Sequence, residues 1–224
     1  MKALDILAHV DHTLLAPTAS WEEMRRLAEE AIRYRTASVC VPPAYVARLR
    51  KTYGKELTIC TVIGFPLGYE ATAGKVFAAQ EAVGNGADEI DAVMNRTDAK
   101  NGDFAAVKLE IAALKAAVGD RVLKIIVEAC DLTVGEKIAA CRCVTEGGAD
   151  FIKTSTGFGK GGATHEDVEL FRLHIGAGVR IKAAGGIRTV EDMEAYLKQG
   201  CERIGASAAV RLLAAKADAE QAEK

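Results

Sequence analysis

Short runs of apolar and β-branched residues alternate along the chain with longer runs in which apolar positions recur at the spacing of an α-helix. This alternation is typical of βα units that surround a parallel sheet. Hydroxyl residues also stand three positions before an acid at Ser20, Thr164 and Thr189, as they do at helix N-termini. The pattern predicts eight strands, within residues 9–15, 37–42, 57–65, 88–94, 122–129, 150–155, 179–186 and 202–207.

Glycines follow the helical runs at the points where a left-handed C-cap would end a helix. They are Gly54, Gly84 with Gly86, Gly147 with Gly148, Gly176 with Gly178, and Gly200. Eight pairs of strand and helix in 224 residues predict a (β/α)₈ barrel, the α/β fold known as the TIM barrel. An open doubly wound sheet is the alternative, although no GxGxxG sequence follows the first strand. We find no linker, so we expect a single domain over residues 1–224 that ends in a short polar helical tail.

Composition narrows the class of protein. The chain has 29 Lys and Arg residues against 31 Asp and Glu residues, a net charge of −2, which excludes a broad basic surface for nucleic acid. Half of the residues are hydrophobic, so the chain can build a core and fold to a surface of roughly 10,000 Å². The six cysteines form no CxxC pair, and no apolar run reaches the ~20 residues of a membrane span. We therefore expect a soluble, cytoplasmic protein with no nucleic-acid or membrane partner.

Polar residues near the C-terminal ends of barrel strands matter most, because barrel active sites form at that end. This criterion selects Asp91 on the fourth strand, Lys153 on the sixth and Lys182 on the seventh. A lone lysine in such a place is usually exposed or salt-bridged. Two lysines at matching places in neighbouring βα units are expected to meet in the barrel mouth, where Asp91 would compensate their charge.

A neutral lysine can add to a carbonyl and form an iminium ion, which accepts electrons when a carbon–carbon bond breaks. An ordinary lysine has a pKa of about 10.4, so burial and a neighbouring cation are needed to favour the neutral amine. We predict that Lys153 is the nucleophile and that Lys182 is the cation that favours its neutral form. Asp91, with an ordered water, would then move the protons.

A second group of residues predicts a phosphate site. Gly185 and Gly186 follow the seventh strand and Ser207 follows the eighth, where barrels often bind phosphate through backbone N–H groups and a helix N-terminus. The glycines by themselves fit tight turns equally well. The histidines on either side of Asp11 form no metal-binding pattern, so no metal site is predicted. Cys40, near the end of the second strand, is best interpreted as a small buried residue.

Eight blocks cover nearly the whole chain in order: VDHTLLAPTAS, SVCVPPAYV, TVIGFPLG, EIDAVMN, IIVEACDLT, GADFIKTSTGFGKGGAT, IKAAGGIRTVED and RIGAS. They resemble the deoxyribose-phosphate aldolase family. The resemblance implies a (β/α)₈ barrel and a class I, or Schiff-base, lyase of deoxyribonucleotide catabolism. Such an enzyme reversibly cleaves 2-deoxy-D-ribose 5-phosphate to D-glyceraldehyde 3-phosphate and acetaldehyde, without a metal or an organic cofactor.

Matched motif by motif, the resemblance implies that Lys153 forms the Schiff base and that Lys182 and Asp91 are the other catalytic residues. It also implies a set of substrate-binding residues. These are Asp11 and Thr156 as contacts to sugar hydroxyls, Gly157, Gly185, Gly186 and Ser207 as the phosphate cradle, and Cys40 as a cysteine near the site.

The chain departs from the family pattern at several positions. Arg96 and Thr97 stand where Ile and Gly are common, Pro42 where Asn is usual, Ala16 where Lys is common, and Ala208 where a second small hydroxyl residue often lies. Two alternatives stay open, a non-catalytic barrel that binds a phosphosugar and another phosphosugar lyase or isomerase. The expected partners are small phosphosugar and aldehyde substrates, and the chain is compatible with a homodimer or higher homo-oligomer.

Overall fold

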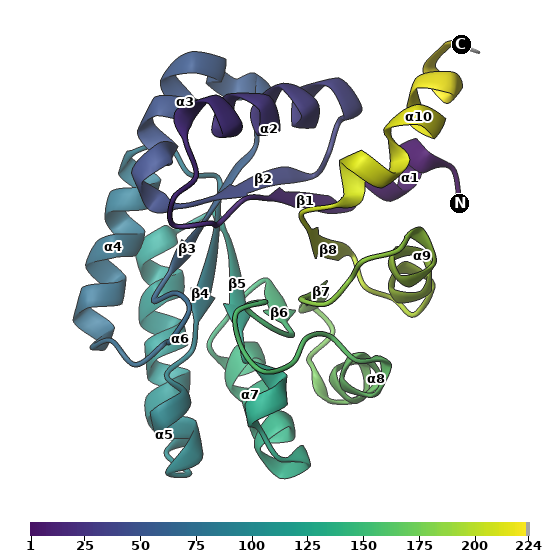
Figure 1. Ribbon diagram of the computed structural model, residues 1–224. Helices are drawn as coiled ribbons and strands as arrows, with labels where there is room; N and C mark the ends of the chain where they lie inside the picture. The colour runs from purple at the N-terminus through teal and green to yellow at the C-terminus, as the bar shows by residue number, and fades with distance from the viewer. Residues whose placement is uncertain (223–224) are drawn as a thin grey trace.

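The computed structural model describes residues 1–222, and these residues form a closed barrel of eight parallel strands (Figure 1). The strands are β1 (Val10–Thr13), β2 (Ser38–Val41), β3 (Ile59–Ile63), β4 (Glu89–Val93), β5 (Val122–Ile126), β6 (Phe151–Lys153), β7 (Arg180–Ala184) and β8 (Arg203–Ala206). Each lies within its predicted range and is shorter than it. Because β1 pairs with both β2 and β8, the sheet has no edge, which confirms the barrel and excludes the open doubly wound sheet.

One principal helix follows each strand and covers the outside of the barrel. These helices are α2 (Trp21–Tyr34), α3 (Val46–Tyr53), α4 (Thr72–Gly84), α6 (Phe104–Val118), α7 (Val134–Glu146), α8 (His165–His174), α9 (Val190–Lys198) and α10 (Ala209–Ala222). The described residues add elements that the pattern did not predict. These are the helices α1 (Ala3–Leu7) and α5 (Arg96–Lys100), and the 3₁₀ turns η1 (Pro43–Tyr45), η2 (Gly54–Glu56) and η3 (Ala129–Asp131).

The predicted helix starts are confirmed in their hydrogen bonds. The side chains of Ser20, Thr164 and Thr189 each accept a bond from the backbone N–H three residues later. The predicted glycine stop after α8 is wrong, because this helix ends with extended backbone at Ile175 and Gly176 has no left-handed conformation. Gly176 is required there for another reason, since the side chain of Thr145 lies where a Cβ would be.

The core has two layers that follow from the alternation of side chains along each strand. Residues that point outward pack against the helices and form one large apolar cluster, which includes Val39, Ile90 and Ile204. Residues that point inward include a set of charged side chains in the barrel interior, which is described below. The accessible surface of the described chain is 10,169 Å², close to the value expected from its length.

The described part of the predicted polar tail, residues 214–222, belongs to α10. This helix packs against α1, and the Glu220 carboxylate accepts the backbone N–H groups of Ala3 and Leu4 at 2.7 and 3.1 Å. The two ends of the chain therefore lie side by side (Figure 1). No helix among residues 1–222 has the length and apolar character needed to cross a membrane.

Candidate active site

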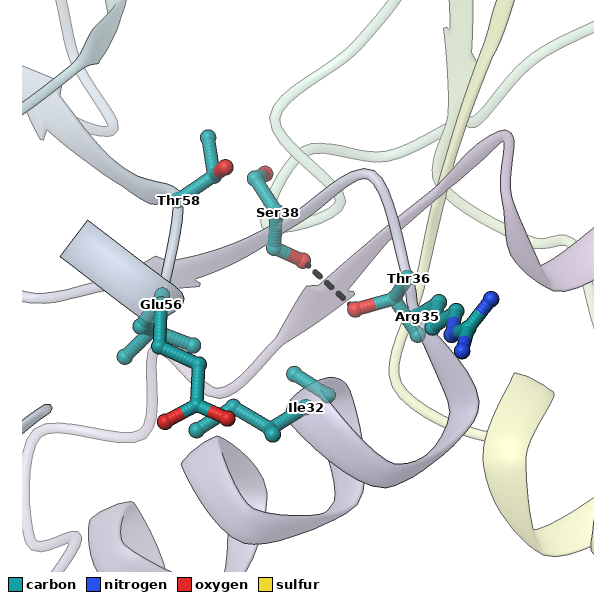
Figure 2. A pocket seen from close by; sticks show the side chains of 8 residues that line it. Ile32, Arg35, Thr36, Ser38, Glu56 and Thr58 are labelled. Atoms are coloured by element: carbon teal, nitrogen blue, oxygen red, sulfur yellow. Dashed lines mark hydrogen bonds between the residues drawn. The ribbon is translucent and has the colours of Figure 1, made fainter.

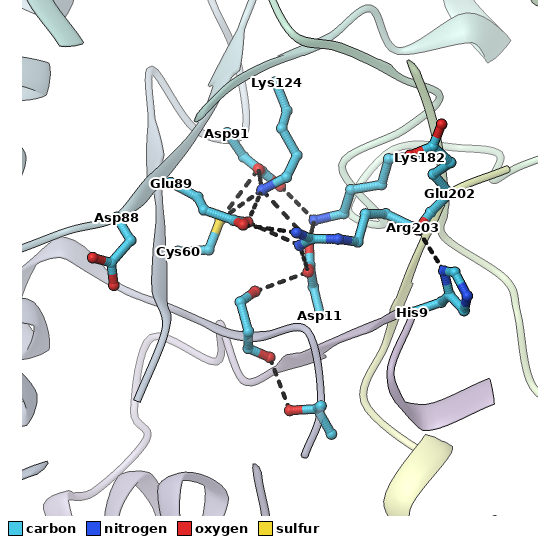
Figure 3. Close-up of polar contacts among 12 residues, drawn as sticks. His9, Asp11, Cys60, Asp88, Glu89, Asp91, Lys124, Lys182, Glu202 and Arg203 are labelled. Carbon is cyan, nitrogen blue, oxygen red and sulfur yellow. Dashed lines mark hydrogen bonds and ion pairs between the residues drawn. The ribbon is translucent and has the colours of Figure 1, made fainter. Parts of the chain in front are cut away.

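Charged side chains from six of the eight strands meet inside the barrel, and we call this set the charged floor. Figure 3 labels all of its members except Lys153. Within the described chain the charged floor contains three carboxylates and four cations. They are Asp11, Glu89 and Asp91, and Lys124, Lys153, Lys182 and Arg203. The strands bring them together through register, since Asp91 lies opposite Lys124, and Lys182 lies opposite both Lys153 and Arg203.

Asp91 is the centre of the charged floor. Its Oδ2 accepts bonds from Lys153 Nζ at 2.8 Å and Lys182 Nζ at 2.7 Å, and its Oδ1 accepts one from Lys124 Nζ at 2.9 Å. Burial opposes ionisation of this carboxyl, but the charges of the three lysines outweigh burial and hold the pKa of Asp91 well below its usual range. The predicted trio of Asp91, Lys153 and Lys182 is thus one hydrogen-bonded group.

Asp11 fixes Lys182 from the other side. Its carboxylate pairs with Lys182, with Arg203 at 2.5 Å and with the Ser38 hydroxyl at 2.8 Å. Burial alone would raise the pKa of Asp11 and lower that of Lys182. Their mutual attraction, with the other charges of the floor, instead holds the pKa of Asp11 well below and that of Lys182 well above the ordinary value. Asp11 is fully buried and both oxygens are occupied, so this geometry does not support the expected contact with a sugar hydroxyl.

Three members of the charged floor were missed by the sequence analysis. Lys124 binds Glu89 at 2.6 Å, and Arg203 binds the same carboxylate with two nitrogens at 2.9 and 2.8 Å. A signal for Lys124 was present, because it is the single charged residue inside the apolar run VLKIIV. Glu89 and Arg203 carried no such signal, since each stands at the start of its strand and the criterion used was the C-terminal end.

A pocket of about 480 Å³ opens above the charged floor at the C-terminal ends of β1, β6, β7 and β8. All residues of the charged floor are described, and Lys153 is the one among them that lines this pocket. Its side chain is 4% exposed. Six of the ten predicted site residues line it: Lys153, Thr156, Gly157, Gly185, Gly186 and Ser207. The other four, Asp11, Cys40, Asp91 and Lys182, lie beneath it and are fully buried.

The glycines of the pocket have backbone conformations that other residues rarely adopt. Gly157, Gly185 and Gly186 have φ values of 82°, 84° and 76°. At Gly185 space is also restricted, since an added Cβ would lie 3.1 Å from the Cα of Gly162 and 3.3 Å from the Cα of Gly157. These loops form a concave wall with backbone close to the pocket, and Ser207 lies on the same wall just before α10.

Cys40 and Cys60 lie side by side on neighbouring strands and are fully buried. A hydrogen bond from Cys60 lowers the pKa of the Cys40 thiol, whereas burial raises that of Cys60. Their sulfur atoms and an Asp91 oxygen lie within 4.8 Å of one another, a spacing that a metal ion could bridge. Both Asp91 oxygens already bind lysine ammonium groups, so a cation there would have to displace them and face their charge.

The departures from the family pattern have distinct places in the structure. Arg96 donates to the carbonyl of Leu67 at 2.7 Å and to Asp131 at 2.8 Å, so it ties the loops after β3 and β5 together across the end of β4. Ala16 lines the pocket, whereas Pro42 precedes η1 on the β2 loop. The bonded partners of Arg96 belong neither to the lining of the pocket nor to the charged floor.

A separate cavity of about 310 Å³ lies beside the start of β2, where Thr36 donates to the carbonyl of Ser38 at 3.2 Å (Figure 2). Its lining includes Arg35, Glu56 and Thr58. This end of the strands is opposite to the pocket above Lys153. In barrels of this kind the N-terminal end of the sheet contributes to stability and the C-terminal end holds the active site.

Known proteins share this chain's sequence and fold. The family described as DeoC/LacD family aldolase matches residues 6–216. A deoxyribose-phosphate aldolase of Clostridium botulinum is 54% identical over 213 residues, 95% of this chain and 96% of that protein. One from Streptococcus agalactiae is 53% identical over the same shares. The structure of deoxyribose phosphate aldolase from Aeropyrum pernix, described as a unique tetramer, aligns with a TM-score of 0.87 and 30% identity over 95% of this chain and 91% of that one.

Proposed function

The chain belongs to the DeoC/LacD family of aldolases, and from this membership and the buried lysines we propose that it is a class I deoxyribose-phosphate aldolase. Its reaction is the reversible cleavage of 2-deoxy-D-ribose 5-phosphate to D-glyceraldehyde 3-phosphate and acetaldehyde. One observation carries the proposal. Lys153 lines the pocket while its Nζ is hydrogen-bonded to Asp91 and its strand position is in register with Lys182.

The charge balance of the floor supports Lys153 as the nucleophile. Among the described residues of the charged floor, four basic side chains face three carboxylates. The floor is therefore neutral overall when one of its basic side chains has no proton to give it charge. Lys124 and Lys182 are fully buried, and carboxylates raise the pKa of both despite the opposing effect of burial. They stay charged, which leaves Lys153, the amine that reaches the pocket, as the nucleophile.

The reaction then follows from the chemistry of an iminium ion. The neutral amine of Lys153 adds to the aldehyde carbon of the open-chain sugar, and loss of water gives the iminium. Removal of the C3 hydroxyl proton breaks the C2–C3 bond, releases glyceraldehyde 3-phosphate and leaves an enamine. Protonation of the enamine carbon and addition of water release acetaldehyde and restore the lysine. Asp91, bonded to Lys153, is the group suited to relay protons through an ordered water.

The wall of glycines supports a phosphate site at the far end of the pocket. Gly157, Gly185 and Gly186 bring backbone close to the pocket without side chains, and Ser207 precedes the N-terminus of α10. Backbone N–H groups, a hydroxyl and a helix N-terminus together favour an anion. We assign the phosphate of the sugar to this wall and the aldehyde to Lys153.

Reductive trapping tests the proposal directly. The protein is incubated with deoxyribose 5-phosphate and borohydride, and the adduct is located by intact and peptide mass spectrometry. We expect one substrate-derived adduct on Lys153, absent in Lys153→Met and kept in the matched control Lys160→Met, whose side chain is 72% exposed. Binding of the sugar without any adduct would refute the aldolase and favour the non-catalytic phosphosugar-binding barrel. Cleavage of a different phosphosugar alone would favour another lyase.

We also propose that the chain works as one barrel domain, in the cytoplasm, as a homo-oligomer. The six cysteines, all within the described residues, are free thiols, which supports a reducing compartment. Phe77 on α4 and Leu109 on α6 are 68% and 67% exposed on neighbouring helices, an apolar surface suited to a second copy. Light scattering that gives a monomer mass would refute the oligomer.

A further inference from the structure

Glu128 is a buried charged residue that neither the sequence analysis nor the proposed mechanism uses. It follows β5 and is fully buried. Its backbone is left-handed, with φ 49° and ψ 64°, a conformation that is rare in residues other than glycine. Such a conformation costs free energy in a residue with a side chain and persists where the surroundings impose it. Among residues 1–222 its carboxylate has no ion-pair partner, unlike the carboxylates of the charged floor.

The Cys130 thiol donates to Glu128 Oε1 at 3.9 Å, and the other contacts of this carboxylate lie on the loop after β6. Thr156 Oγ1 donates to Glu128 Oε2 at 2.5 Å, and the Thr156 backbone N–H approaches both carboxylate oxygens at 3.4 Å. The carboxyl carbon also lies 3.1 Å from the place where a Cβ on Gly159 would be. Glu128 is therefore packed under the loop and directed at Thr156, which lines the pocket above Lys153.

These contacts fix the direction of the Thr156 hydrogen bonds. A threonine hydroxyl has one proton and two lone pairs. The proton is given to Glu128, and one lone pair accepts the backbone N–H of Phe158 at 3.0 Å. The hydroxyl can then offer the pocket only its remaining lone pair, which is an acceptor. It suits a ligand group that donates a hydrogen bond, such as an alcohol, and does not suit a phosphate oxygen, which only accepts.

We propose that Glu128 is a positioning residue that makes Thr156 an obligate acceptor and thereby selects substrates with a hydroxyl at C4. This inference rests on the proposed function. C4 is the position expected because it adjoins the carbon that carries the phosphate, and Thr156 adjoins Gly157 of the phosphate wall. The Glu128 oxygen that accepts the Thr156 proton keeps that proton directed away from the pocket.

Two acceptors for acetaldehyde distinguish this role from a structural one. D-glyceraldehyde 3-phosphate supplies the hydroxyl that becomes C4, whereas 3-phosphonooxypropanal lacks it and keeps the phosphate. In the unaltered protein we expect kcat/KM to favour glyceraldehyde 3-phosphate. In Glu128→Gln, whose amide can donate to Thr156 and free its proton, and in Thr156→Val, we expect the preference to fall about tenfold, the effect of one neutral hydrogen bond.

The outcomes separate the two proposals. Equal losses for both acceptors in both variants would show a purely structural role and overturn the inference on Glu128. The acetaldehyde adduct on Lys153, trapped with borohydride, needs no sugar hydroxyl and should persist in both variants. If the unaltered protein forms no such adduct, the proposed aldolase fails instead. Because Thr156→Val removes only the hydroxyl at constant shape, a folding defect in Glu128→Gln leaves the test intact.

Discussion

Replacing Lys182 by methionine tests whether charge in the floor controls the proton on Lys153. The ammonium groups of Lys153 and Lys182 bond the same oxygen of Asp91, at 2.8 and 2.7 Å, so their nitrogens are no more than about 5.5 Å apart. At an effective dielectric constant of about 20, two unit charges at this distance repel by about 3 kcal/mol. Because the proposed nucleophile is the neutral amine, removal of the Lys182 charge is expected to lower kcat/KM by about 100-fold, the equivalent of about 3 kcal/mol.

The assay is the dependence of kcat/KM on pH for cleavage of deoxyribose 5-phosphate. In Lys182→Met we expect kcat/KM near neutral pH to fall by about 100-fold and to recover at higher pH. Lys182→Arg keeps the charge and should move the profile much less. Circular dichroism confirms that both variants fold. A lower plateau with no displacement of the profile would refute the electrostatic role of Lys182.

Three further predictions concern the stability of the floor and the phosphate wall. Lys124→Met leaves buried carboxylates short of a cation and should lower the free energy of unfolding by about 3–5 kcal/mol in a denaturant titration, whereas the exposed Lys108→Met should cost less than about 1 kcal/mol. Lysine charges hold the pKa of Asp91 well below 3.8 against the effect of burial, so in acid the unfolded chain binds a proton at Asp91 that the folded chain does not. The same titration should therefore show the free energy of unfolding falling as the pH drops below about 4, and a constant free energy of unfolding would contradict this. In Gly185→Ala the added Cβ lies 3.1 Å from backbone, whereas in Gly186→Ala it meets nothing within 4 Å. We expect the KM for deoxyribose 5-phosphate of Gly185→Ala to be at least tenfold higher than that of Gly186→Ala.

Several features were determined by local sequence alone. The alternation of strand and helix patterns predicted the eight strands and their order, and hydroxyl caps at Ser20 and Thr189 marked helix starts because capping is a contact over three residues. The same strand pattern placed Lys153 and Lys182 at matching positions, because consecutive parallel strands in a barrel lie side by side. Local pattern was therefore sufficient wherever the relevant contact joins neighbouring residues or neighbouring strands.

Only the tertiary structure decided which charges meet inside the barrel and which reach solvent. Arg203 on β8 contacts Glu89 on β4, and Asp11 on β1 contacts Lys182 on β7, across a closed sheet whose interior no local pattern describes. Burial of Asp11 beneath Lys182 likewise depends on the stagger of strands and the depth of the pocket. The direction of the Thr156 proton depends on Glu128, 28 residues earlier, which closure of the barrel brings to within hydrogen-bond distance. Sequence thus supplied the chemical groups, and barrel closure selected their partners, because electrostatic and hydrogen-bond energies depend on distances that only the closed sheet sets.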